Sequence, residues 1–70
     1  MFKVGDWATS VGHKGLIQIM KLVGEKAIVE TFRSNGQPLG ITGKLLSELE
    51  HATPEEIAAG HRIDGDQQND

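Results

Sequence analysis

The chain has 70 residues, no cysteine, 37% hydrophobic residues and a formal net charge of −3. This length supports one domain at most, and a chain without cysteine has no disulfide framework, thiolate metal site or thiol nucleophile. No apolar run approaches the roughly 20 residues that cross a bilayer, and residues 1–6 contain no apolar signal core, so we expect a cytoplasmic protein without a membrane partner.

The first half of the chain predicts short strands separated by glycine turns. The first strand is expected over residues 6–11, followed by a turn at Gly12-His-Lys-Gly15, where two glycines bracket a polar pair. The longest strand is expected over residues 16–23. A tight turn at Gly24-Glu25 then leads into a third strand over residues 26–32.

An asparagine–glycine pair marks the next hairpin. Ser34-Asn-Gly-Gln37 predicts a two-residue primed turn, for which Asn-Gly is the preferred pair. A short fourth strand follows over residues 38–44, in which Gly40 and Gly43 predict strong bending or a close approach of another backbone segment. Residues 45–50 are compatible with two structures, a single helical turn followed by a short strand or the start of a longer helix.

Residues 53–60 carry the signals of a short helix. Thr53 stands at the N-cap, Pro54 at the first helical position and Glu56 at the third, which together form a capping box. Gly60 stands where the helix is expected to end. No apolar residue follows Ile63, so we expect residues 61–70 to form a disordered acidic tail.

These elements predict a mainly β protein. Its expected architecture is a small barrel of about five short strands over residues 1–52, with the capped helix at 53–60 appended to it and the tail at 61–70. The alternative is an α+β arrangement, in which residues 43–60 form a helical hairpin across a three-stranded meander.

Four short runs resemble the SH3-like barrel, especially the KOW-type modules of transcription and ribosome-associated proteins. The runs are Val4-Gly-Asp-Trp7, Gly12-His-Lys-Gly-Leu-Ile17, Glu25-Lys-Ala-Ile-Val29 and Asn35-Gly36, and the resemblance covers residues 2–50. It implies a barrel that binds RNA, DNA, proline-rich peptides or other proteins.

No arrangement of residues predicts an enzyme. The three histidines share no helical i, i+3 or i+4 spacing, so they predict neither a metal site nor an acid–base pair. A phosphate-binding loop around Gly43-Lys44 would need glycine at position 38 and serine or threonine at position 45, where this chain has Pro38 and Leu45. We therefore expect no catalytic residue, no metal and no cofactor.

Five residues are candidates for binding a partner: Trp7, His13, Lys14, Phe32 and Arg33. The favoured interpretation of Trp7 is the main side chain of a small core, and the alternative is a surface anchor. The same two interpretations apply to Phe32, and the core is again favoured. The turn at residues 12–15 presents His13 and Lys14, and loops on a rigid scaffold often carry function.

Nucleic-acid binding is the alternative prediction. Residues 1–46 carry a formal charge of +3, whereas residues 47–70 carry −6. A phosphate-binding strip in the basic part would consist of Lys14, Lys21, Lys26, Arg33 and Lys44. The acidic sequence pI of about 5.5 argues against this class of partner.

The sequence thus predicts a small binding or adaptor module that recognises a protein or nucleoprotein assembly. Its small size also fits a phage- or mobile-element-type regulator of host machinery. The alternative is a KOW-like module of transcription or translation that binds RNA or DNA directly. Because a short fourth strand leaves a sheet edge exposed, we expect a monomer or a weak homodimer.

Overall fold

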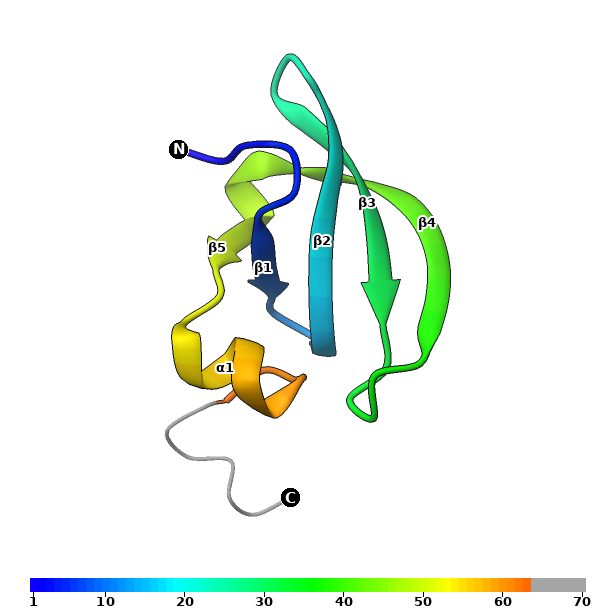
Figure 1. Ribbon diagram of the computed structural model, residues 1–70. Coiled ribbons are helices and arrows are strands. Elements are labelled where there is room, and N and C mark those ends of the chain that lie inside the picture. The colour runs from blue at the N-terminus through cyan, green and yellow to red at the C-terminus, as the bar shows by residue number, and fades with distance from the viewer. Residues whose placement is uncertain (64–70) are drawn as a thin grey trace.

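A computed structural model describes residues 1–63 of the chain (Figure 1). Five antiparallel strands form one sheet in the order β4-β3-β2-β1-β5. In chain order the elements are β1 (Trp7–Ser10), β2 (His13–Val23), β3 (Lys26–Phe32), β4 (Pro38–Leu45), the 3-10 turn η1 (Leu46–Glu48), β5 (Leu49–His51) and α1 (Pro54–Ala59). The prediction of a mainly β protein with one short helix is confirmed, and the alternative helical hairpin over residues 43–60 is wrong.

The ambiguous segment at residues 45–50 takes the first of its two predicted forms. Leu46–Glu48 make one 3-10 turn, and the chain then continues as the short strand β5. β5 pairs with β1, on the side of β1 away from β2. The sheet therefore begins and ends on β4 and β5, which are consecutive strands in the chain (Figure 1).

β2 begins earlier than predicted, at His13. Ser10 pairs with His13, so the turn is confined to Val11 and Gly12, where Gly12 has a φ of +85°. The register between β1 and β2 then shifts between Ser10 and Ala8. An isolated bridge joins Gly15 to His61.

The predicted primed turn between β3 and β4 is wrong. The amide of Arg33 donates to the carbonyl of Gln37 at 2.7 Å, and the amide of Gly36 donates to the carbonyl of Arg33 at 2.8 Å. Of the loop residues, only Gly36 has a positive φ, +93°, whereas a two-residue primed turn would require it of Asn35 as well. The hairpin therefore closes through a three-residue loop, for which one left-handed glycine is sufficient.

Of the two alternatives predicted for Gly40 and Gly43, the structure shows bending and not a close approach. Gly40 has a φ of +136° at a register shift between β3 and β4, and Figure 1 shows β4 as a strongly curved strand. No close approach of backbone occurs at either residue, because a Cβ atom built on them would meet nothing within 4 Å. The glycine that the fold does require for close approach is Gly15.

One face of the sheet carries the hydrophobic core. Successive residues of a strand point to opposite faces, and the residues on the core face come mainly from β1, β2 and β3. The core cluster consists of Ala8, Ile17, Ile19, Ala27, Val29 and Leu49. Phe2, Leu22 and Leu46 are partly buried against it.

The segment after α1 is joined to the sheet. The Arg62 amide donates to the carbonyl of Lys14 at 2.7 Å, and its Nη1 donates to the carbonyl of Ser10 at 3.2 Å. Residues 61–63 therefore do not belong to a disordered tail, because backbone pairing with β2 holds them in place. The rest of the predicted tail, residues 64–70, lies outside the described residues.

Candidate binding groove

Trp7, Leu16 and Phe32 lie on the face of the sheet opposite the core. Ala8 pairs with Ile17 and both belong to the core cluster, so the neighbouring residues Trp7 and Leu16 point to the other face. The same alternation places Phe32 there. The Trp7 and Phe32 rings are in contact, with centroids 5.5 Å apart and planes at 55°.

The favoured prediction that Trp7 and Phe32 belong to the core is therefore wrong. Neither ring is in the core cluster, and both are half-buried. The core is instead filled by aliphatic side chains, and the largest of those that are fully buried are Ile17, Ile19 and Val29. The rings of Trp7 and Phe32 are therefore not covered by the core, and another segment or a partner is needed to shield them from solvent.

The C-terminal helix covers part of this patch and leaves an apolar groove. The groove has a volume of about 240 Å³ and is lined by Trp7, Leu16, Phe32, Gly36, Ile57 and Gly60. Figure 1 shows α1 at the end of the sheet where β1 ends and β2 begins. The sheet thus forms the floor, and the β3–β4 turn and α1 form the walls. Ile57 is 44% exposed, so the apolar lining of the groove is open to solvent.

Gly15 allows the end of β3 to lie against the start of β2. A Cβ atom built on Gly15 would be 1.7 Å from the carbonyl oxygen of Phe32 and 2.7 Å from the carbonyl carbon of Arg33. Any side chain at this position would push the end of β3 away. Gly15 therefore determines where the Phe32 ring lies in the groove, and sequence analysis identified this glycine only as a turn residue.

Glu56 is a buried residue of α1 that holds the helix in position through hydrogen bonds at both of its carboxylate oxygens. The Glu56 amide donates to the Thr53 hydroxyl at 3.1 Å, and the Thr53 amide donates to Oε1 of Glu56 at 2.9 Å, so the predicted capping box is confirmed. In addition, Oε2 of Glu56 accepts from the Ile63 amide at 2.9 Å. Glu56 is only 6% exposed, and its carboxylate joins the start of the helix to the segment that returns to β2.

The other predicted contact residues do not line the groove. His13 is half-buried, and its Nε2 atom is buried without a hydrogen-bond partner among residues 1–63. Lys14 is exposed, and its carbonyl is used by Arg62. Arg33 is exposed and follows Phe32 in the chain. The structure therefore brings together Trp7 and Phe32.

The five basic residues of the predicted strip are divided between two ends of the sheet. Lys14 and Lys21 stand seven residues apart in β2, roughly 23 Å at the usual rise of a strand. Antiparallel pairing of β2 with β3 places Arg33 at the Lys14 end and Lys26 at the Lys21 end. Lys44 is half-buried in β4. They do not form one continuous strip.

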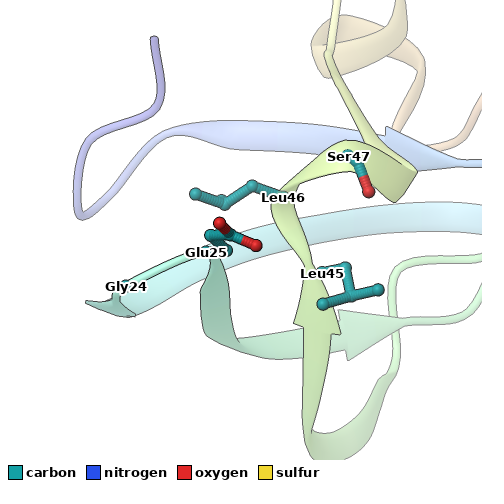
Figure 2. A pocket seen from close by; sticks show the side chains of 5 residues that line it. All are labelled: Gly24, Glu25, Leu45, Leu46 and Ser47. Carbon is teal, nitrogen blue, oxygen red and sulfur yellow. The ribbon is translucent and has the colours of Figure 1, made fainter.

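A second hollow lies at the end of the sheet away from α1. Figure 2 shows the residues that line it, Gly24, Glu25, Leu45, Leu46 and Ser47, and its volume is about 300 Å³. The Leu46 amide donates to the carbonyl of Glu25 at 2.8 Å, which joins η1 to the β2–β3 turn. Its lining mixes leucines with a carboxylate and a hydroxyl and contains no aromatic residue, so the groove beside Trp7 is the better candidate for binding.

The described residues offer neither a metal site nor a membrane-spanning helix. Residues 1–63 contain no group of three His, Cys, Asp or Glu side chains placed to hold a metal ion, and no helix there has the length and apolarity needed to cross a membrane. No family model, curated protein or solved structure matches this chain. The groove beside Trp7 is therefore the main candidate site in residues 1–63.

Proposed function

We propose that this protein is a non-enzymatic adaptor that binds an apolar segment of a partner protein in the groove beside Trp7. The observation that carries the proposal is the contact between Trp7 and Phe32 on the face opposite the core, at the floor of an open apolar groove. Tryptophan is a favoured anchor of protein interfaces, because it offers a large apolar surface together with an N–H donor.

The arrangement of strands supports an SH3-like barrel as the scaffold in this proposal. The order β4-β3-β2-β1-β5, with η1 between β4 and β5, fits the fold expected from the runs at residues 2–50. We further propose that the barrel is related to KOW-type modules and that the protein acts as a phage- or mobile-element-type regulator.

Two variants distinguish this proposal from direct binding of nucleic acid. Ile57→Lys places a charge in the wall of the groove, at a residue exposed enough to be changed without disturbing the core. The double variant Lys14→Glu with Arg33→Glu reverses the charges at one end of the sheet and leaves the lining of the groove unchanged. Each variant is immobilised and used, beside the natural chain, to capture partners from cytoplasmic extract at low and high salt, with and without nuclease.

The proposal predicts a protein partner that is retained after nuclease treatment and at high salt. Capture of this partner should be lost with Ile57→Lys and kept with the double charge reversal, because a packed apolar interface changes little with salt. Recovery of nucleic acid alone, lost at high salt and with the double charge reversal, would overturn the proposal in favour of phosphate contacts.

A further inference from the structure

β4 is an edge strand whose second side is open. It pairs with β3 alone in the sheet. Among residues 1–63, no other backbone–backbone hydrogen bond reaches Pro38–Leu45. The Leu45 amide donates to Oε1 of Glu48 at 3.3 Å, so this one donor would have to exchange its partner when a second strand pairs with β4. Alternate residues of such a strand direct their N–H and C=O groups away from the sheet, and these groups form a template for another strand.

The exposed side chains of β4 are apolar on the face opposite the core. Ala27 and Val29 are buried, so Lys26, Ile28 and Glu30 of β3 point to that outer face, together with the residues paired to them. Four apolar residues there are exposed: Val23, Ile28, Ile41 and Leu45, at 52%, 37%, 64% and 40%. Ile28 lies diagonally from both Ile41 and Leu45, whose direct partners on β3 are the charged residues Glu30 and Lys26.

The open edge is complementary to itself. Residues 40–45 keep a regular register with β3, and the register shift lies before them, so Gly43 is at the centre of the regular stretch Ile41–Leu45. A two-fold axis through Gly43 pairs Ile41 of one copy with Leu45 of the other on the outer face. On the core face, Lys44 then lies opposite Thr42 of the other copy, so the only charged residue of β4 does not meet its own copy.

We infer that β4 joins two copies of this chain into an antiparallel dimer centred on Gly43. A second copy is the fitting occupant, because this register places an apolar side chain opposite an apolar one at Ile41 and Leu45 and creates no like-charge pair. Gly43 carries no side chain on the axis, and a Cβ atom there would meet nothing within 4 Å in the single chain. The dimer would continue the sheet through both copies and leave the groove beside Trp7 open.

The test is sedimentation of the full chain from about 1 µM to about 1 mM, the range in which weak complexes dissociate. We expect the mass to rise with concentration from 7.6 kDa towards twice that value. Ile41→Lys should keep the chain monomeric across the range. The matched control is Val11→Lys, which changes a valine that is 85% exposed in the β1–β2 turn and should dimerise like the natural chain.

Hydrogen exchange provides a second readout that does not depend on a variant. Amide protection within residues 41–45 should increase with protein concentration, whereas protection in β5, the other edge, should not. A natural chain that stays monomeric to about 1 mM would overturn the inference. So would a dimer that survives Ile41→Lys, or one that Val11→Lys disrupts equally, because each would place the contact elsewhere. Circular dichroism verifies that both variants fold.

Discussion

At the scale of single residues, Gly15 and Glu56 are the two that hold the groove in shape. Gly15 lets the Phe32 backbone approach β2, and Glu56 ties the start of α1 to Ile63. Neither residue offers a chemical group to the groove. Both act by positioning the residues that line it, so their substitution should be visible first in stability.

Gly15→Ala should destabilise the fold severely. Its Cβ atom would lie 1.7 Å from a backbone oxygen, a contact that only a shift of the whole end of β3 relieves. We expect a loss of at least about 3 kcal/mol in the free energy of unfolding, at the upper end of overpacking effects. Denaturation followed by Trp7 fluorescence measures it. Gly43→Ala, with open space around its Cβ atom, is the control, and an equal loss in the two variants would contradict the account.

Glu56→Gln should weaken the protein by about 1–3 kcal/mol. Both carboxylate oxygens accept backbone N–H groups, and the amide of glutamine keeps only one acceptor for these two donors. Glu55→Gln, at an exposed position on the same turn of α1, should change stability by less than about 0.5 kcal/mol. Urea denaturation of the two variants measures this difference in stability. Similar midpoints would mean that the hydrogen bonds of the Glu56 carboxylate contribute little.

At the scale of elements, α1 is short and depends on its ends. It spans six residues, begins at the Thr53 cap and ends at Gly60, whose φ is +82°. Isolated helices of this length are not stable in water. α1 is therefore held by its capping interactions and by its contact with the sheet, and the wall of the groove depends on both.

Thr53→Ala should lower the free energy of unfolding by about 1 kcal/mol, the usual effect of losing an N-cap side chain. The Glu56 amide would lose its acceptor at 3.1 Å. Thr53→Ser, which keeps the hydroxyl, should restore most of the stability. Thermal unfolding of the three proteins measures both effects, and no difference between alanine and serine would show that the cap is not what holds the helix.

Local sequence patterns predict the helix and the strands, but they do not predict contacts between residues that are far apart in the chain. The capping box at Thr53 and the strand at residues 26–32 depend on neighbours in the chain, so they could be predicted. The approach of Phe32 to Gly15, and the pairing of Gly15 with His61, depend on residues far apart in the sequence. No local signal distinguishes the glycine that must lack a side chain from one that only turns the chain.

The placement of Trp7 shows the same limit. The sequence predicts its position within the first strand, but whether the ring faces the core depends on which face of the sheet receives the aliphatic residues of β2 and β3. Ile17 and Ile19 fill that face, so the indole lies with Phe32 on the other. The sequence thus predicts Trp7 and Phe32 as candidates. That Ile57 and Gly36 also line the groove can be seen only in the folded structure.

Across the whole molecule, the two ends of the sheet differ in the side chains that they expose. The end with α1 holds the apolar groove, and the other end holds the hollow of Figure 2 beside the β2–β3 turn. The basic residues are shared between these ends, and the chain carries a net charge of −3. This distribution favours a partner held by apolar contact over one held by a field of positive charge.

The measurement that tests this claim most directly is the salt dependence of the affinity for the captured partner, for the natural chain and for Ile57→Lys. We predict an affinity that is nearly independent of salt and that falls at least about tenfold in the variant, the scale of a lost interface anchor. A logarithmic slope of about −2 or steeper against salt, with Ile57→Lys binding as tightly as the natural chain, would reveal several phosphate contacts and contradict the role of the groove.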